Sequence, residues 1–460
     1  MRNKYDVIVI GGGSAGFSIL EQISHQGLKI ALVENRKLGG SCPNFACVPT
    51  KALVKSAEVL HSARNSANFG ILAKDVSFDW TKVQEYRTKM VANTAAQESE
   101  EDLKEKEVDL IWGTAKFISP NEIEVDPSTG SGHTAKRYYA DRFVISTGSR
   151  ATIPVIPGID EVSVIDSDKA VELPKLPKSL IIVGAGPVGI ELAQIYDRFG
   201  TKVTVIVRGN RILSREEPEV ASLAQKFLEE DSIKFIFGAN IRGVTQEGRK
   251  KQLHIDTKNK HEVVGGEEIL MAIGRTPNTD MLDLDKTSVA YSGKGIKTNE
   301  FMQSSQSHIY AAGDDVGIML FTHNASYEGY IIGRNLLGEK LKADHRVIPR
   351  GTFSDPEIGS VGIMEEEARK KGFEVKTSKM PYGGGRGDIV SDPEGLIKVT
   401  VDGKTRQILG ASVIGRMAAE FVHFIALAMH ARIPVDTLDT MVYAFPTYAE
   451  GIAGITEYLE

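Results

Sequence analysis

The chain has 460 residues, enough for more than one domain, and its 41% hydrophobic and 25% charged residues are typical of a globular protein. A formal net charge of −6 gives no basic surface for nucleic acid or an acidic membrane, and no apolar run is long enough to span a bilayer. The first six residues lead into a short strand rather than the apolar core of a signal peptide, and only two cysteines follow. We therefore expect a cytosolic protein with no nucleic-acid or membrane partner.

A dinucleotide-binding motif opens the chain. Residues 7–10 form an apolar run that predicts a buried parallel strand, a G-x-G-x-x-G turn follows at 11–16, and a helix is expected over 17–26. The second strand, 29–33, leads to Glu34. Glycines in such a turn let the backbone approach a pyrophosphate, and an acid about 20 residues further on binds a ribose hydroxyl. We predict a dinucleotide site; the alternative is a simple glycine turn.

The two cysteines, Cys42 and Cys47, are the only thiols in the chain and lie at positions i and i+5. A disulfide scaffold or a zinc site would need more cysteines, or histidines, at other spacings. A helix is expected from Cys47 to about Ala63. Near its first turn the two thiols can come within disulfide distance, and a helix N-terminus lowers the pKa of a thiol. We interpret them as a redox-active pair; the alternative is two small buried residues that meet by chance.

The segment after the cysteines is expected to be helical and charged over 88–107, and then to form short strands. The strands are expected at 111–113, 122–125 and 142–145, a turn at 127–132, the end of the segment at 146–149, and a linker marked by Pro154, Pro174 and Pro177.

A second dinucleotide-binding unit spans residues 179–207, with a strand, a glycine turn at 184–189, a helix at 190–199 and a further strand. Two such units imply two dinucleotides. The last strand ends at Val207, where an NAD site would have an acid. Three arginines follow it: Arg208, Arg211 and Arg215. Because guanidinium groups suit a 2′-phosphate, they favour NADPH over NADH; the alternative is a solvated basic loop.

The last part of the chain changes pattern. A strand from residue 309 ends in Gly313-Asp314, before a helix expected at 324–337. The Asp314 carboxylate can bind a sugar hydroxyl or, alternatively, cap the helix. From about Leu341 the pattern is α+β, with strands and a helix expected at 396–401, 409–414 and 418–431. That helix is apolar all round, so we expect it to be buried, within the domain or at a subunit contact.

Together and in this order, the two glycine turns, the cysteine pair, Gly274-Arg275 and Gly313-Asp314 resemble the motifs of the flavoprotein disulfide reductases. This is the class I pyridine nucleotide-disulfide oxidoreductase family of glutathione reductase, dihydrolipoamide dehydrogenase and mercuric reductase. The resemblance implies an α/β fold with two Rossmann-like dinucleotide-binding domains, for FAD and NAD(P), and a C-terminal α+β dimerisation domain, hence a homodimer. The FAD domain would be discontinuous, at 1–150 and 271–340, with the NAD(P)H domain at 151–270 and the interface domain at 341–460.

The resemblance also implies the site residues, and no metal. FAD would be held by Gly11, Gly13, Ser14, Ala15, Gly16, Glu34, Gly40, Ser41, Lys51, Thr147, Gly148 and Asp314. NAD(P) would be held by Gly184, Gly186, Gly189, Arg208, Arg215 and Gly274. The catalytic set would be Cys42, Cys47, Lys51, Glu191 and Glu450. In the implied relay, NAD(P)H gives a hydride to the flavin and two electrons pass to the Cys42–Cys47 disulfide. Cys47 then interacts with the flavin as a thiolate, Cys42 attacks the substrate, and Glu191 pairs with Lys51 near the flavin.

One position departs from this family. Where the family has a histidine that protonates the departing thiol, paired with a glutamate, this chain has Phe445 and keeps the glutamate as Glu450. Phenylalanine cannot transfer a proton. Weaker substitutes nearby are Tyr443, Tyr448 and Glu450. Both tyrosines are expected to be packing residues, and the two histidines of the apolar helix, His423 and His430, are expected to be structural.

Two further departures bear on the substrate. The chain lacks the additional C-terminal cysteine pair of mercuric reductases, and it keeps Cys47, the second redox cysteine that soluble transhydrogenases usually lose. Pro187 stands where glutathione reductase has the tyrosine that gates its nicotinamide pocket. We therefore expect an open or differently gated pocket and little preference for glutathione.

Three functions follow from these residues. The first is an FAD-dependent NAD(P)H oxidoreductase that uses its cysteine pair on a disulfide or thiol-reactive substrate. The second, favoured by Phe445, is an NAD(P)H oxidoreductase whose small-molecule electron acceptor is a quinone, a metal ion, oxygen or another nicotinamide. The third is a non-enzymatic flavoprotein subunit, which the retention of both cysteines, Lys51 and Glu191 disfavours.

Overall fold

The computed structural model describes residues 3–127, 134–258, 260–392 and 394–460. The chain folds into two compact units. The first combines Met1–Ala52, Gln84–Thr152 and Gly274–Asp344, and the second combines Leu53–Val83, Ile153–Ile273 and His345–Glu460. The segments predicted as the NAD(P)H domain and the interface domain fall mainly in this second unit, so their separation into two domains stays a prediction. The turn predicted at 127–132 lies, after residue 127, outside the described ranges.

The first unit is built on a seven-stranded sheet in the order β3-β2-β1-β6-β5-β4, with β18 beside β6. The strands are β1 (Asn3–Ile10), β2 (Ile30–Glu34), β3 (Val108–Trp112), β4 (Thr114–Ser119), β5 (Glu122–Asp126), β6 (Lys136–Ile145) and β18 (Ile309–Ala311). β1 runs parallel to β2 and β6, and β18 runs parallel to β6. Their register aligns Ile10 with Val33, and Ile145 with both Ile10 and Ala311. The carboxyl ends of these four strands therefore meet at one edge, where ligands bind in sheets of this kind.

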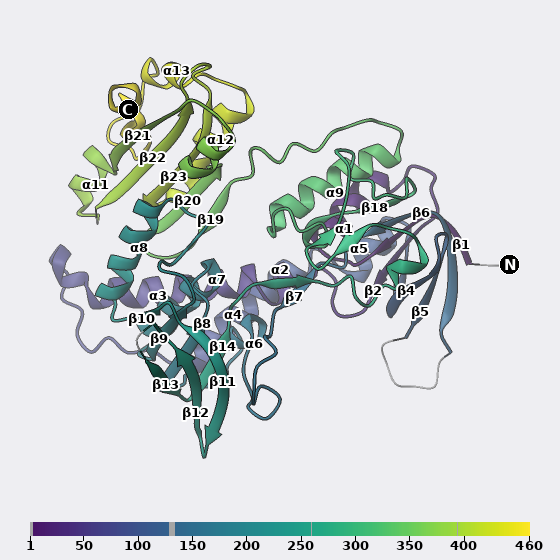
Figure 1. The fold of residues 1–460 in the computed structure, drawn as a ribbon, viewed down its shortest axis with the longest axis horizontal. Coiled ribbons are helices and arrows are strands. Elements are labelled where there is room, and N and C mark those ends of the chain that lie inside the picture. Colours follow the sequence, from purple (N-terminus) through teal and green to yellow (C-terminus); the bar gives the residue numbers. More distant parts are fainter. Residues whose placement is uncertain (1–2, 128–133, 259, 393) are drawn as a thin grey trace. The chain divides into compact units, whose positions relative to one another are not determined.

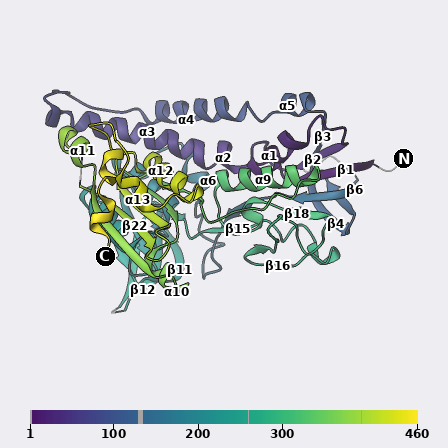
Figure 2. The same ribbon diagram turned by 90° about the horizontal axis from the view of Figure 1, so that it is seen from above.

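Two helices pack together in the core of this unit: α1 (Ser14–Ile23) and α9 (Thr322–Leu336). Figure 1 and Figure 2 both show them side by side. Two glycines of α9 allow this close approach, because a Cβ on Gly329 would lie 2.6 Å from the carbonyl oxygen of Ala15, and one on Gly333 would lie 2.5 Å from Cβ of Gln22. The smaller elements are α2 (Ser41–Asn44), α5 (Glu100–Glu105), β7 (Ser149–Ala151), β15 (Arg275–Pro277), β16 (Tyr291–Ser292), β17 (Gly295–Ile296), η2 (Leu284–Lys286) and η3 (Gly313–Asp315).

Two longer helices, α3 (Cys47–Arg64) and α4 (Trp80–Ala95), each contribute residues to both units. The start of α3 at Cys47 and its end near Ala63 agree with the prediction. The single charged helix predicted over 88–107 is wrong, since the chain leaves α4 after Ala95 and begins α5 at Glu100. Ser99 explains the restart, because its hydroxyl accepts a hydrogen bond from the N–H of Asp102 and caps α5.

The described residues of the second unit form three sheets. A parallel sheet has the order β10-β9-β8-β14, an antiparallel one β11-β12-β13, and a five-stranded one β19-β20-β23-β22-β21. The strands are β8 (Ser179–Val183), β9 (Lys202–Val207), β10 (Lys234–Phe237), β11 (Asn240–Glu247), β12 (Lys250–Asp256), β13 (His261–Gly266), β14 (Glu268–Met271), β19 (Arg350–Thr352), β20 (Glu357–Gly362), β21 (Val375–Tyr382), β22 (Gly395–Asp402) and β23 (Ile408–Gly415). The helices are α6 (Ser167–Ala170), α7 (Pro187–Arg198), α8 (Pro218–Glu230), α10 (Glu365–Lys370), α11 (Gly384–Val390), α12 (Ala418–His430) and α13 (Val435–Asp439), with short 3-10 turns η1 (Ser66–Phe69), η4 (Ala449–Ile452) and η5 (Ile455–Tyr458).

The apolar helix predicted at 418–431 is α12, which packs against the five-stranded sheet through residues such as Val422 and Ile425 (Figure 1). Its opposite face is not buried within the chain, since Leu427 is 63% exposed and His423 and His430 are exposed. We predicted that this helix would be buried within its domain or at a subunit contact. The domain buries one face of α12 and leaves the other exposed. Within the described ranges, no helix combines the length and the apolar character that crossing a bilayer requires.

Candidate functional site

The two cysteines lie at the starts of neighbouring helices in the first unit. Cys42 is in α2, Cys47 is the first residue of α3, and both side chains are half-buried. The pKa of Cys42 is raised far above its ordinary value, first by its hydrogen bond with Cys47, then by burial and by the charge of Cys47. A hydrogen bond with Thr322 opposes this rise, and the charge of Glu98 adds to it. Thr322 also contacts the other thiol, with 3.5 Å between its Oγ1 and Cys47 Sγ. The predicted pair is therefore brought together.

The segment that carries Cys42 is docked on the first glycine turn. Gly13 and Gly39 form a parallel β-bridge, and a Cβ on Gly40 would lie 2.8 Å from Cα of Gly13. Gly40 has a φ of 67°, a conformation that favours glycine, and it precedes Ser41, the first residue of α2. The side-chain amide of Asn44 donates to the carbonyl oxygens of Leu38 and Gly40 and holds this loop. The structure thus joins two motifs that the sequence shows separately.

The first glycine turn has the close contacts that its spacing predicts. Gly11 has a φ of 107°, and a Cβ on it would lie 2.2 Å from the carbonyl oxygen of Ser146. A Cβ on Gly16 would lie 2.2 Å from the carbonyl oxygen of Gly11. Gly13 precedes α1 without a side-chain cap, which leaves the N–H groups of the first turn, beginning with Ser14 and Ala15, open to an anion.

Glu34 lies at the carboxyl end of β2, and its side chain is buried beside the same turn. One carboxylate oxygen accepts a hydrogen bond from the N–H of Gly12 at 2.8 Å, and the other accepts from Asn35 and Arg36. A fixed carboxylate beside an uncapped helix N-terminus fits the ribose and pyrophosphate of a dinucleotide. The residues of this edge of the sheet therefore suit the predicted cofactor.

The third part of this edge contains Thr147, Gly148 and two adjacent aspartates. The sequence indicates Asp314, but the carboxylate that binds Thr147 Oγ1 and the N–H of Gly148, each at 2.8 Å, belongs to Asp315. Asp315 is fully buried, and burial raises its pKa to about 7. Asp314 instead accepts a hydrogen bond from Ser149 and lies 3.6 Å from the guanidinium of Arg275. Asp315 was missed because the Gly-Asp motif names one aspartate where the chain has two.

The second glycine turn, in the second unit, repeats the geometry of the first. Gly184 has a φ of 110°, with a Cβ position 2.2 Å from the carbonyl oxygen of Ala272, and a Cβ on Gly189 would lie 2.2 Å from the carbonyl oxygen of Gly184. Gly186 precedes α7 without a side-chain cap and has no atom within 4 Å of its Cβ position. Pro187 is the first residue of that helix.

The arginines follow β9 as predicted. Val207 is buried, Arg208 and Arg215 are exposed, and the guanidinium of Arg211 donates to the carbonyl oxygen of Ser214 at 2.8 Å. Gly274, predicted to join this nucleotide site, lies in the other unit. Its carbonyl oxygen accepts from the N–H of Thr152, next to the antiparallel pair of β7 and β15.

Lys51 and Glu191 lie in different units. Lys51 is in α3, four residues after Cys47. Glu191 is buried in α7 and accepts a hydrogen bond from the N–H of Phe353 at 3.0 Å. Their predicted ion pair stays a prediction.

Near the C-terminus, Phe445 and Glu450 approach the same point. A Cβ on Gly385 would lie 2.2 Å from a carboxylate oxygen of Glu450 and 3.1 Å from the ring of Phe445. Phe445 is 75% exposed.

The two tyrosines beside it are packing residues, as expected. Tyr448 stacks on Tyr382 and donates a hydrogen bond to Asp392. Tyr443 donates to the carbonyl oxygen of Leu438, and burial raises its pKa to about 12, so its phenol is a poor base near neutral pH. His423 bonds the carbonyl oxygen of Ala419 in its own helix, which fits the structural interpretation.

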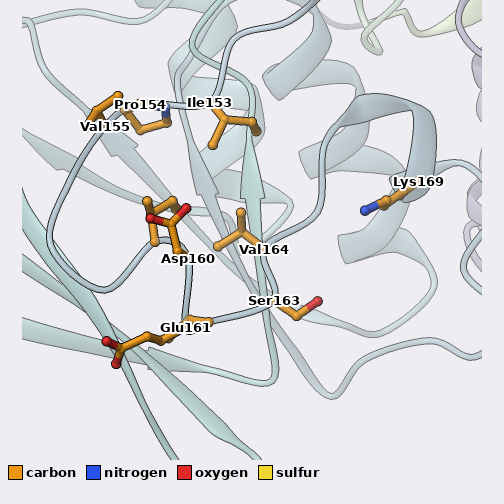
Figure 3. Close-up of a pocket in the computed structure, with 10 residues that line it drawn as sticks. Ile153, Pro154, Val155, Asp160, Glu161, Ser163, Val164 and Lys169 are labelled. Carbon is orange, nitrogen blue, oxygen red and sulfur yellow. The ribbon is translucent and has the colours of Figure 1, made fainter.

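A cavity of about 640 Å³ lies elsewhere in the second unit, where the chain enters it after Thr152 (Figure 3). Its polar side chains are Asp160, Glu161, Ser163 and Lys169. Figure 3 shows the carboxylates of Asp160 and Glu161 well apart from Lys169. No predicted site residue lines it.

Comparison with known proteins shows which family this chain is similar to over most of its length. A family model described as pyridine nucleotide-disulphide oxidoreductase matches residues 5–329, and a model of that family's dimerisation domain matches residues 348–454. A mercuric reductase of Staphylococcus aureus is 32% identical over 451 residues, which cover 97% of this chain and 81% of that protein. A dihydrolipoyl dehydrogenase of Bacillus subtilis (strain 168) is 33% identical over 463 residues, covering 98% and 97%.

A solved structure is also similar. The Cu(II) complex of the HOCl-induced flavoprotein disulfide reductase RclA from Escherichia coli superimposes with a TM-score of 0.86 at 26% identity, covering 99% of both chains.

Proposed function

Because this chain belongs to the pyridine nucleotide-disulphide oxidoreductase family, we propose that it is an FAD-dependent NAD(P)H oxidoreductase that reduces a disulfide or thiol-reactive acceptor through Cys42 and Cys47. The observation that carries this proposal is the contact between the two thiols, on a segment that rests on the first glycine turn. The family and the enzyme class predicted from the sequence are confirmed by the family match over residues 5–329.

We assign FAD to the first unit. The residues proposed to hold it are Gly11, Gly13, Ser14, Ala15, Gly16, Glu34, Gly40, Ser41, Lys51, Thr147, Gly148 and Asp314, and we add Asp315, which positions Thr147 and Gly148. When bound, FAD would take a hydride from reduced pyridine nucleotide and supply two electrons to a disulfide. The protein contributes the first glycine turn, the uncapped N-terminus of α1 and the carboxylate of Glu34, which is fixed by its hydrogen bond from Gly12.

We assign the pyridine nucleotide to the turn before α7, through Gly184, Gly186 and Gly189. NADPH is the proposed donor, since Val207 lacks a carboxylate for a ribose 2′-hydroxyl while Arg208 and Arg215 present exposed guanidinium groups directly after it. Gly274 lies directly before β15 in the first unit and is included in this site only by resemblance to the family.

The two thiols are proposed to divide the work. Cys42 gives up its proton as its sulfur attacks one sulfur of an acceptor disulfide, which forms a mixed disulfide and releases the first thiolate. The Cys47 thiolate then attacks the sulfur of Cys42, releasing the second thiolate and forming the Cys42–Cys47 disulfide. The dithiol has lost two electrons, and two protons convert the released thiolates to thiols. Thr322 supports the charge on Cys47 through its hydroxyl.

Phe445 favours a second candidate, reduction of an acceptor that needs no protein acid, such as a metal ion or a quinone. The phenyl ring cannot protonate a departing thiolate. Tyr443 is a poor substitute, because its pKa is raised to about 12 and its hydroxyl already donates to the carbonyl oxygen of Leu438. The names of two similar proteins bear on this choice, since one is a mercuric reductase and the other a dihydrolipoyl dehydrogenase. This chain has no further cysteine with which to bind a metal ion.

A homodimer is proposed on the match of residues 348–454 to a dimerisation domain. The exposed face of α12 at Leu427 and the exposed ring of Phe445 are apolar surfaces that a second copy would cover.

The test is reduction of the purified, FAD-containing protein with NADPH and, separately, with NADH. Long-wavelength absorption of a thiolate beside the flavin is expected with NADPH at lower concentrations than with NADH. Disulfides, quinones and thiophilic metal ions are then compared as acceptors for the wild type and Cys42→Ser. Loss of turnover with disulfides alone supports the first candidate. If Cys42→Ser reduced every acceptor at the wild-type rate, the cysteines would have no part in the reaction and the proposal would be contradicted.

A further inference from the structure

Glu98 lies against the segment that carries Cys42, although 56 positions separate them. It lies just after α4 and before Ser99, the cap of α5. A Cβ on Gly39 would lie 2.5 Å from a carboxylate oxygen of Glu98 and 2.7 Å from the ring of Pro43. The carboxylate of Glu98 therefore contacts the loop between the first glycine turn and Cys42. No sequence motif includes it.

This carboxylate has acidic neighbours. Within the described part of the chain it makes no ion pair and no side-chain hydrogen bond. The charged groups that face it are Asp102 of α5, which is paired with Lys106, and Glu21 of α1. Burial, followed by the charges of Asp102 and Glu21, raises the pKa of Glu98. When Glu98 is ionised, no cation in contact with it among the described residues neutralises its charge, so that charge acts on the neighbouring loop.

We propose that Glu98 is a charge-positioning residue for Cys42. Its negative charge, close to the loop before Cys42, adds to the contact with Cys47 and the burial that already favour a neutral Cys42, and it disfavours acceptors that bring negative charge to Cys42. The setting of Cys47 differs because it is the first residue of α3, whose N-terminus favours a thiolate, while the hydroxyl of Thr322 contacts both sulfurs. The acceptor class this predicts is neutral or cationic at the reacting end.

A negative charge is therefore less favourable on Cys42 than on Cys47. Cys42 faces Cys47 and the charge of Glu98, both of which raise its pKa. The inference rests on the proposed assignment of Cys42 as the thiol that meets the acceptor. Thiol labelling tests it without turnover, so its failure leaves the redox assignment in place.

The chain suits this test because it has only two cysteines. In the Cys47→Ser background, every thiol reaction of the FAD-loaded protein reports Cys42. Two disulfide probes are used, the dianion 5,5′-dithiobis(2-nitrobenzoate) and the neutral 4,4′-dithiodipyridine, and the ratio of their rate constants isolates charge from accessibility. Glu98→Gln should raise the anionic-to-neutral ratio about threefold to tenfold, the effect of one partly screened charge. The pH midpoint of Cys42 alkylation should fall in the same variant.

The matched control is Glu101→Gln, which removes the same charge from an exposed position on α5 and should leave both values unchanged. Glu98→Ala is the second charge-removing variant, with bound FAD and circular dichroism as checks of folding. The Cys42→Ser background, which reports Cys47, should respond less to Glu98→Gln. An unchanged ratio in both Glu98 variants, or an equal shift at Cys47 and Cys42, would overturn the proposal.

Discussion

The hydroxyl of Thr322 lies 3.5 Å from the sulfur of Cys47, and each of these residues is the first of its helix. Two helix N-termini, those of α3 and α9, therefore meet at a single thiol. Each N-terminus carries a partial positive charge from its unpaired N–H groups. A thiolate on Cys47 is stabilised by both helices and by one hydroxyl.

Thr322→Val should raise the pKa of Cys47, because it removes the hydroxyl with little change in volume. A hydrogen bond to a charged group contributes about 1.5 to 3 kcal/mol, so the expected rise is about one to two pH units. The measurement is the pH dependence of alkylation in the Cys42→Ser background, where Cys47 is the only thiol. Thr322→Ser keeps the hydroxyl and should behave as the wild type. Equal midpoints for the Val and Ser variants would show that the contact has no electrostatic role.

Two glycines of the second turn should separate folding from nucleotide binding. Gly189→Ala places a Cβ 2.2 Å from the carbonyl oxygen of Gly184, so we expect it to destabilise the protein by about 2 to 4 kcal/mol. Gly186→Ala meets no atom within 4 Å and should leave the melting temperature unchanged, while its methyl group stands before the uncapped start of α7. It should weaken NADPH binding about tenfold. Melting curves and NADPH titrations measure the two effects; full NADPH affinity in Gly186→Ala would place the nucleotide elsewhere.

The fold class could be predicted because its signals are local. The α/β prediction, with two dinucleotide-binding units and a C-terminal α+β part, is confirmed by the family matches and by the RclA structure. The strands at 179–183 and 202–207 match β8 and β9 because they consist mainly of apolar and β-branched residues. β11, β12 and β13 were not predicted, since they are half-exposed and rich in charged residues, as in Lys250–Asp256.

Contacts between distant segments could not be predicted in this way. The order of the motifs does not show that Gly39 bridges Gly13, or that Glu98 reaches the loop before Cys42. The choice between Asp314 and Asp315 depends on how the turn at Gly313 directs two adjacent side chains. These features arise from packing, which a motif does not encode.

Asp315→Asn should flatten the dependence of stability on pH. Burial raises the pKa of Asp315 from 3.8 to about 7 in the folded protein, although its bonds from Thr147 and Gly148 oppose the rise. The unfolded chain ionises this group near pH 4, so its contribution to stability is complete below pH 4 and is lost as the pH rises to about 7. The measurement is the melting temperature between pH 4 and pH 8, in which the wild type should fall more steeply than the variant. Parallel curves would mean that Asp315 does not titrate in this range.

Phe445→His should increase disulfide reduction, because it restores an acid and base where the family has one. Glu450 is placed to orient the new imidazole, since Glu450 and Phe445 both approach the Cβ position of Gly385. We expect kcat/KM for a neutral disulfide to rise about tenfold or more, at the lower end of general acid–base effects. Phe445→Leu is the control for altered packing, and adding Glu450→Gln to the histidine variant should abolish the gain. Turnover of quinones and metal ions needs no such proton and should stay constant. If the histidine variant reduces disulfides no faster than the leucine variant, proton transfer at position 445 does not limit this enzyme.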